Sequence, residues 1–111
     1  MANDTDLGRA GGVTQEKVLG LLSAVKDPEV GINIVDLGLV SWVKVTETAV
    51  EVEFTLTYPG CPLGPTIEEQ IVRAVKDGTG IGEVRARIVW EPPWSEERMS
   101  EAARLELGYP I

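Results

Sequence analysis

Hydrophobic residues recur at helical spacing in two stretches of the chain. The first lies between Thr14, which can cap a helix, and Asp27-Pro28, where the proline disfavours helical geometry in the residue before it. The second runs from Gly64-Pro65, since proline suits the first helical position, to Asp77-Gly78. Their apolar stripes are Val18, Leu19, Leu21, Leu22 and Val25 in the first, and Ile67, Ile71, Val72 and Val75 in the second.

Alternation of apolar and polar residues predicts the strands. It is cleanest over residues 50–57, with Val50, Val52, Phe54 and Leu56 on one face and Glu51, Glu53, Thr55 and Thr57 on the other. Two further strands are expected at residues 39–46 and 84–90, and Pro92-Pro93 ends the last of them. Ser100 is expected to cap a final short helix that Gly108 closes.

This order of elements predicts an α+β fold, a two-layer sandwich of order α-β-β-α-β-α. A three-stranded sheet would carry its helices on one face. The apolar face of residues 50–57 should then meet Leu21, Leu22, Ile71 and Val75 across one core. On the other face, Glu51 and Glu53 would lie near basic residues of neighbouring strands, namely Lys44, Arg85 and Arg87.

Composition places the chain among small globular domains. Its 111 residues, 43% of them hydrophobic, suit one domain over residues 13–111, and the acidic and glycine-containing residues 1–12 are expected to form a flexible tail. No apolar run reaches the ~20 residues of a membrane-spanning helix, and the start carries no signal-peptide pattern. We therefore expect a cytoplasmic protein that does not bind a membrane.

Charge and residue types narrow the chemistry. A net charge of −8 disfavours binding to nucleic acid, because phosphate backbones are repelled. The chain has no histidine, so a nucleophile paired with histidine is excluded. It has one cysteine, which excludes an intramolecular disulfide and a four-cysteine zinc or iron–sulfur site within one chain.

The single cysteine, Cys61, lies between the second strand and the second helix in a loop rich in proline and glycine. Ligand sites of α/β folds often lie beyond strand ends, and a helix N-terminus favours a thiolate. A free cysteine is also a common small apolar filler. Both interpretations are open at this point.

Two carboxylates flank the bend at Pro28. Asp27 and Glu29 could bind a metal or orient a thiol, or they could cap the helix end and face solvent. Asp36 stands alone in an apolar run and is expected to satisfy loop amides.

Three tryptophans are candidates for packing or for partner contacts. Trp90 and Trp94 could lock the C-terminal segment onto the domain or line a partner surface. Trp42 falls beside Lys44 by strand alternation, on the less buried face, where an exposed indole would suggest association.

Four motifs in a fixed order resemble the small iron–sulfur assembly family that includes SufT and PaaD, and whose domain also occurs in the eukaryotic cytosolic iron–sulfur targeting factor. The resemblance covers about residues 14–108. The motifs are Asp27-Pro28-Glu29, residues 34–40 (IVDLGLV), residues 57–63 (TYPGCPL) and residues 90–95 (WEPPWS).

The resemblance implies a role in maturing iron–sulfur proteins and a fold similar to the C-terminal domain of NifU-type scaffolds. Carried over by position, the functional residues are Asp27, Glu29, Thr57 and Cys61. Many relatives have a second threonine where this chain has Tyr58, which would narrow access to Cys61 or donate its hydroxyl in the same place. PaaD proteins usually carry further C-terminal cysteines, so the chain fits the SufT-like branch better.

The leading hypothesis is therefore an assembly or targeting factor, not an enzyme. A cluster commonly needs four ligands, so Cys61 would hold iron or a cluster only transiently, with other ligands from a second subunit or a partner. We expect no tightly bound cofactor, a homodimer, and partners among iron–sulfur scaffold or client proteins, with Trp42, Tyr58 and Trp94 as contact residues. The alternatives are an adaptor whose loop binds no metal, and a thiol-dependent enzyme.

Overall fold

The computed structural model describes residues 13–57 and 60–108. Its first helix, α1 (Gln15–Leu22), begins where the sequence predicts. The Thr14 hydroxyl accepts a hydrogen bond from the Lys17 amide at 3.1 Å. The helix ends before the predicted boundary at Asp27-Pro28. The reason is that the following residues pair with the next loop: the Ile34 amide donates to the Val25 carbonyl, and Lys26 forms a bridge with Asn33.

The second helix, α2 (Gly64–Thr79), begins as predicted, with Pro65 in its first turn. It continues through the predicted end at Asp77-Gly78 and stops at Gly80, which is left-handed with φ 76°. Gly78 serves the packing of the two helices instead, because a Cβ there would lie 2.3 Å from Cδ2 of Leu21 in α1. The glycine that ends the helix is thus two residues later than predicted.

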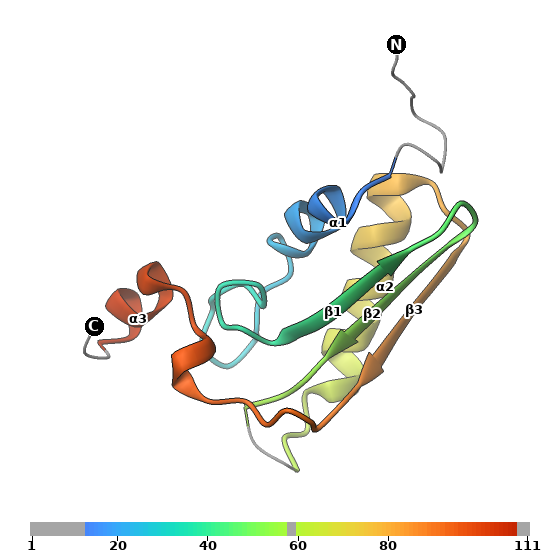
Figure 1. Cartoon of the computed structure of the whole chain (residues 1–111). Coiled ribbons are helices and arrows are strands. Elements are labelled where there is room, and N and C mark those ends of the chain that lie inside the picture. The colour runs from blue at the N-terminus through green and yellow to red at the C-terminus, as the bar shows by residue number, and fades with distance from the viewer. Residues whose placement is uncertain (1–12, 58–59, 109–111) are drawn as a thin grey trace.

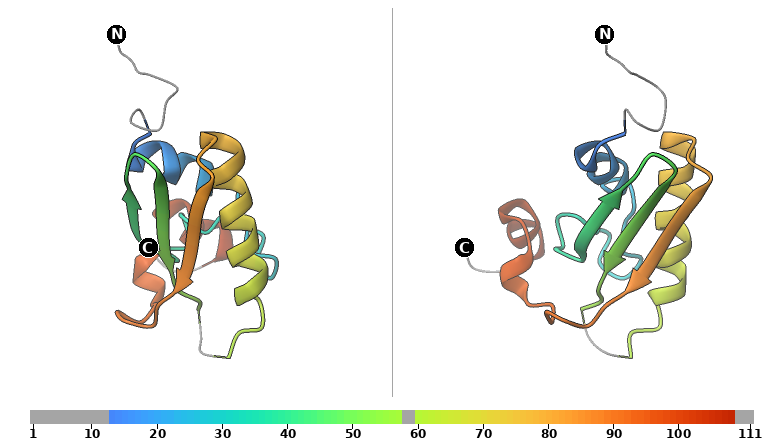
Figure 2. Two further views of the ribbon diagram at one scale, coloured as in Figure 1. Left: turned by 90° about the vertical axis from the view of Figure 1, so that its right-hand side faces the viewer. Right: turned by 45° about the vertical axis from the view of Figure 1, so that its right-hand side comes forward.

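The sheet has three strands, β1 (Val40–Val45), β2 (Ala49–Phe54) and β3 (Glu83–Ile88), in the order β1-β2-β3. Strands β1 and β2 are antiparallel, whereas β2 and β3 are parallel and are connected through α2. Figures 1 and 2 show α1 and α2 covering one face of this sheet. The predicted α+β sandwich is confirmed.

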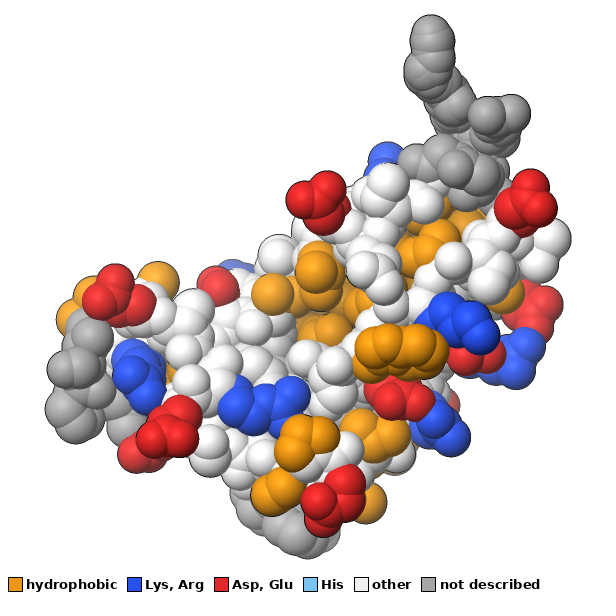
Figure 3. All heavy atoms as spheres, viewed as in Figure 1, with side chains coloured by type: hydrophobic (Ala, Val, Ile, Leu, Met, Phe, Trp, Pro, Cys, Tyr) orange, Lys and Arg blue, Asp and Glu red, His pale blue; other side chains and the backbone are white. Residues whose placement is uncertain are grey.

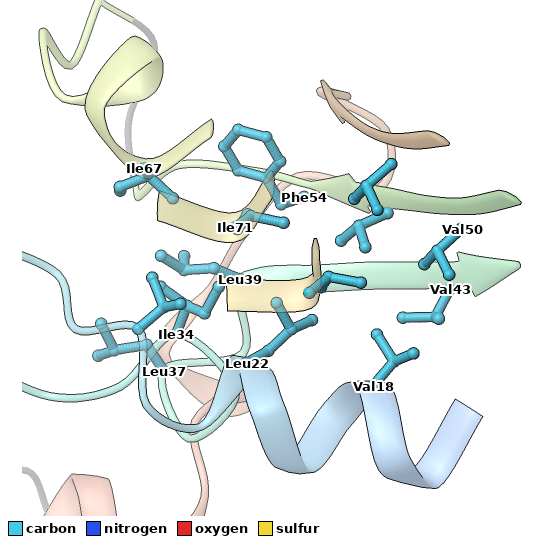
Figure 4. Close-up of a cluster of buried hydrophobic side chains, with 14 of the residues drawn as sticks. Val18, Leu22, Ile34, Leu37, Leu39, Val43, Val50, Phe54, Ile67 and Ile71 are labelled. Carbon is cyan, nitrogen blue, oxygen red and sulfur yellow. The ribbon is translucent and has the colours of Figure 1, made fainter. Parts of the chain in front are cut away.

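The core lies between that face and the two helices (Figure 4). Val50, Val52, Phe54 and Leu56 are all buried there, so the predicted orientation of the strand is confirmed. They belong to one cluster with Leu22, Ile71, Val75 and the loop residues Ile34, Leu37 and Leu39. Leu21 is only half-buried and packs on Gly78 instead.

The other sheet face carries the predicted ion pairs. Glu51 lies opposite Arg85 and Glu53 opposite Arg87, and both pairs form salt bridges. A hydrogen bond from Arg85 to the Glu83 carboxylate, followed by the charges of Glu83 and Glu51, raises the pKa of this already basic group further. This half of the face is polar and open to solvent.

Beyond the ion pairs, the same face differs from the alternation pattern. Thr55, which the pattern places with Glu51 and Glu53 on the polar side, is completely buried. The chain after β3 remains paired with β2 here, because the Val89 amide donates to the Phe54 carbonyl at 2.8 Å. The Thr55 amide itself donates to the Leu39 carbonyl at 2.7 Å.

The C-terminal arm, residues 89–108, leaves the sheet through a short 3-10 helix (Glu96–Arg98) and α3 (Glu101–Leu107). The Ser100 hydroxyl caps α3 and Gly108 closes it, as predicted. Figure 1 shows α3 away from the sheet, beside the loop that precedes β1. The Ser100 amide donates to the Asp36 carbonyl at 2.7 Å, which ties the arm to that loop.

Candidate functional site

The parallel pairing of β2 and β3 brings two predicted motifs to one edge of the sheet. The carboxyl ends of parallel strands point the same way, so the cysteine loop after β2 and the tryptophan segment after β3 leave from the same end (Figure 1). Thr57 follows β2 by three residues, and Trp90 follows β3 by two. The fold thereby joins segments more than thirty residues apart in the chain.

Cys61 is a free, half-buried thiol at this edge and packs against the hydrophobic core. It precedes α2, whose N-cap residue Leu63 offers no side-chain hydrogen bond to the first turn. Among the residues that the structure describes, no side chain caps the amides of that turn, an arrangement that favours negative charge nearby. Thr57 is also half-buried, whereas Tyr58 lies outside the described residues.

Asp27 is buried, and its carboxylate organises its own loop. Its Oδ1 atom accepts hydrogen bonds from the Glu29 amide at 2.7 Å and the Val30 amide at 3.3 Å. Asp27 therefore neither caps the end of α1, which closes at Leu22, nor faces solvent, as one of the two sequence interpretations had it. Asp36 likewise has a local partner, because its Oδ2 atom accepts from the Asn33 side-chain amide at 2.7 Å.

Glu29 is exposed on the surface. Within residues 13–57 and 60–108, no three histidine, cysteine, aspartate or glutamate side chains lie close enough together to hold a metal ion. The loops that carry Asp27, Glu29 and Cys61 thus form no ready metal cage in the described part of the chain.

A cavity of about 390 Å³ opens next to the cysteine loop. Residues 55–57 line one side, and Trp90, Glu91, Pro93 and Trp94 line the other. The Trp94 indole N–H donates to the Leu37 carbonyl at 2.7 Å, so this ring fixes the arm to the domain, as its packing interpretation expected. Trp90 remains 45% exposed.

Thr55 is a polar residue of this cavity that sequence reasoning did not select. Its hydroxyl is buried and lacks a hydrogen-bond partner among the residues that the structure describes. The available signal was its position on the polar side of the alternation, two residues before Thr57. Nothing in the local sequence indicated that the C-terminal arm would cover it.

Trp42 stands apart from the cavity, on the open face of the sheet. It lies opposite Glu53 in the strand register and is 46% exposed, so its predicted place on the less buried face is confirmed. On the face seen in Figure 3, hydrophobic side chains stand between basic and acidic ones over the strands. This surface is amphipathic and without strong charge of one sign.

Comparison with protein families finds a family model that spans both the sheet and the candidate loops. The family model for the iron–sulfur cluster assembly protein matches residues 15–88, which include Asp27, Thr57 and Cys61. The chain belongs to this family. The resemblance inferred from the four motifs is confirmed.

Individual relatives agree with this assignment. The chain is 40% identical to the Fe-S protein maturation auxiliary factor YitW of Bacillus subtilis, over 85% of the chain and 93% of the relative. It is 45% identical to the Fe-S protein maturation auxiliary factor SufT of Staphylococcus aureus, over 76% of the chain and 97% of the relative. Both relatives are named as maturation factors.

A solved structure shows the same fold. The domain of unknown function DUF59 from Bacillus anthracis matches with a TM-score of 0.81 and 37% identity, over 86% of this chain and 92% of that one.

No helix within the described ranges is long and apolar enough to cross a membrane.

Proposed function

We propose that this iron–sulfur assembly factor works through Cys61, which transiently engages iron, an iron–sulfur cluster or a client protein. The observation that carries the proposal is the place of the chain's single cysteine. It is a half-buried free thiol beside an uncapped helix start, inside the segment that the family model matches. A thiolate there is a suitable soft ligand for iron.

The neighbouring candidates would assist Cys61 in different ways. Thr57, three residues after β2, would offer its hydroxyl to a ligand at the cysteine loop. Asp27 would keep its loop in shape, because its carboxylate accepts hydrogen bonds from two loop amides. Glu29 is exposed and would supply a carboxylate to an arriving cation. Tyr58 would shape the entrance to the loop.

One thiol cannot complete the ligand set of a cluster, which commonly has four. The remaining ligands would come from a second copy of the chain, a scaffold or client protein, or small thiols. This supports a transient site, no tightly bound cofactor and a homodimer. The maturation-factor names of the relatives support an auxiliary role in place of catalysis, which we place in the cytoplasm. The net charge of −8 supports a role without nucleic acid as partner, and we propose none for a membrane.

Anaerobic reconstitution with ferrous iron and sulfide tests the proposal. The native chain is expected to gain visible absorbance and bound iron, and Cys61→Ser to lose most of both, because a hydroxyl is a far weaker ligand for iron than a thiolate. Ser23→Ala, at an exposed position, is the control and should bind iron like the native chain.

The adaptor alternative predicts a different result. The observation that favours the adaptor is the exposure of two tryptophans, Trp42 and Trp90, which suits a docking role. If Cys61→Ser retains both iron and the ability to activate an apo-ferredoxin supplied with a loaded scaffold, Cys61 binds no metal and the chain acts as an adaptor.

A further inference from the structure

The two edges of the sheet differ in how their backbone groups are used. The strand order leaves β1 at one edge and β3 at the other (Figure 2). At the β1 edge, the side-chain amide of Gln15 donates to the Val43 carbonyl at 2.6 Å. The register of β1 is also irregular between Val40 and Trp42. Features of this kind keep an edge from pairing with a further strand, so the β1 edge is closed.

The β3 edge is regular and open. The strand pairs with β2 in an unbroken parallel register, and the Val89 amide continues this pairing by donating to the Phe54 carbonyl. Successive amides of a strand point to opposite sides, so those of Ala86 and Ile88 point away from β2. Both residues are half-buried, and neither amide has a backbone partner in the part of the chain that the structure describes. This edge is able to pair with one more strand.

A groove of about 550 Å³ opens along this edge, where β3 lies beside α2. Residues 84–87 of β3 line it, together with residues of β2 and with Glu68 and Val72 of α2. Arg85 and Arg87 lie on the open face of the sheet, where their side chains are 63% and 73% exposed. A strand added at the edge therefore meets a valine on its helix side and two guanidinium groups on its open side.

The pairing of β3 with β2 indicates the chemistry that this strand accepts. In β2, the residue opposite each of the two arginines is a glutamate, and valines alternate with these glutamates. A guanidinium group has five N–H donors, so it is able to bind a second carboxylate on its other side. Opposite charges across two strands stabilise the pairing, and like charges destabilise it. A strand with the same alternation of acidic and apolar residues as β2 therefore fits the free edge.

A second copy of β3 fits this edge less well. The antiparallel registers with the longest overlap are centred on Arg85 and on Ala86. The first sets Arg85 opposite the same residue of the other copy, and the second sets Arg85 opposite Arg87. Both registers are destabilised by arginines that face each other. The edge thus disfavours pairing with itself and favours an acidic segment of a different protein.

We propose that the β3 edge binds an extended segment of a partner protein in which acidic residues alternate with apolar, β-branched residues. The segment lies antiparallel to β3, the slightly more stable arrangement, and exchanges backbone hydrogen bonds with Ala86 and Ile88. Its carboxylates contact Arg85 and Arg87 on the open face, and its apolar side chains contact Val72 on the helix side.

The edge leads to the cysteine loop. A Cβ at Gly64, the first residue of α2, would lie 2.8 Å from Cδ1 of Ile88, the last residue of β3. The end of β3 thus packs against the start of α2, three residues after Cys61. A segment bound at the edge brings its own protein to that loop. The inference rests on the proposed function only for the kind of partner, a scaffold or client protein.

Amide hydrogen exchange followed by NMR tests the proposal on the full chain. The probe is the blocked peptide Val-Glu-Val-Glu-Val, which is expected to protect the amides of Ala86 and Ile88. The same peptide with an N-methyl group on its central valine should not protect them, because that amide pairs with Ala86. The peptide Val-Lys-Val-Lys-Val should bind about tenfold more weakly, although the net charge of −8 attracts it.

Three variants separate edge pairing from other contacts. Ala86→Pro removes the outward N–H, which an edge strand tolerates, so the variant should keep its circular dichroism spectrum and bind the glutamate peptide about tenfold more weakly. Arg85→Gln should bind it about threefold more weakly, because one cross-strand ion pair is lost. Arg73→Gln is the control, since Arg73 is 72% exposed and paired with Glu69 but does not line the groove. It should bind the peptide like the native chain.

Several outcomes would overturn the proposal. They are unprotected amides in the presence of the glutamate peptide, equal binding of the lysine or N-methylated peptide, and equal affinities of Arg85→Gln and Arg73→Gln. Protection of Ala86 by a higher protein concentration alone would also overturn it, because the occupant is then a second copy. If Ala86→Pro unfolds, the N-methylated peptide makes the same comparison in the native chain.

Cys61→Ser distinguishes this proposal from the proposed function. The variant should bind the glutamate peptide like the native chain, because the thiol does not take part in strand pairing. A failure of iron binding therefore leaves the edge proposal intact, and a failure of peptide binding leaves the Cys61 proposal intact.

Discussion

At the scale of single residues, one side chain of the candidate site, Asp27, already has a structural task. Asp27 accepts hydrogen bonds from the amides of Glu29 and Val30, while the backbone of the same residue exchanges two further bonds with Gly31 and Ile32. A loop held in this way can position a carboxylate without the help of a regular element. The charge of Asp27 and its capping geometry are therefore separable properties.

Two substitutions of Asp27 separate these properties. Asp27→Asn keeps an oxygen acceptor for the two amides, so its free energy of unfolding should stay within about 0.5 kcal/mol of the native value, while iron loading falls if the charge matters. Asp27→Ala removes the acceptor and should cost about 1–3 kcal/mol. Urea unfolding measures the first quantity and iron content the second. Normal iron loading in a folded Asp27→Asn chain would make Asp27 a purely structural residue.

At the scale of elements, the C-terminal arm depends on a close contact with the loop before β1. Gly38 is left-handed with φ 78°, and a Cβ there would lie 2.3 Å from the Arg98 carbonyl oxygen. The neighbouring Leu37 carbonyl accepts the indole N–H of Trp94. The contact therefore determines where the tryptophan side of the cavity lies relative to the sheet.

Gly38→Ala should displace the arm. Alanine would meet both the left-handed penalty and a backbone clash, so the free energy of unfolding should fall by about 2–4 kcal/mol. Gly80→Ala is the matched control, since Gly80 has φ 76° but no atom within 4 Å of its added Cβ. That variant should lose only about 1 kcal/mol. Equal losses of unfolding free energy in the two variants would show that the Arg98 carbonyl can move aside at little cost.

At the scale of the whole molecule, one side of the sheet is covered by helices and the other is partly open. The open side combines Trp42 with the ion pairs of β2 and β3. Such a mixed surface is typical of interfaces that form between folded subunits. It is the surface through which we expect two copies to associate.

Light scattering on a size-exclusion column tests the homodimer. The native chain at high micromolar concentration is expected to have twice the monomer mass, and Trp42→Ser to shift toward monomer, because the loss of an indole from an interface often costs 2 kcal/mol or more. Val30→Ser removes a similarly exposed apolar side chain, 44% against 46%, and serves as the control. A native chain that is monomeric throughout would contradict the prediction.

The order of the elements, the core face of β2 and the location of the cysteine loop were determined by the sequence itself. The two-residue period of β2 allows only one buried face. Thr14, Ser100 and Gly108 cap or end their helices through hydrogen bonds to residues within about one helical turn. Signals of this kind are local and can be read from the chain alone. The ends of α1 and α2 were predicted less well. Residues after α1 pair with Asn33, which is distant in the chain, and Gly78, the expected end of α2, packs against Leu21 while the helix continues to Gly80.

The tertiary structure alone decided which loops meet. The parallel register of β2 and β3 brings Thr57 and Trp90 to one edge, although no local pattern specifies whether two strands are parallel neighbours. The burial of Thr55 has the same origin, since strand alternation describes a face but not the arm that later covers it. A cavity depends on contacts between segments far apart in the chain, and those contacts exist only once the chain has folded.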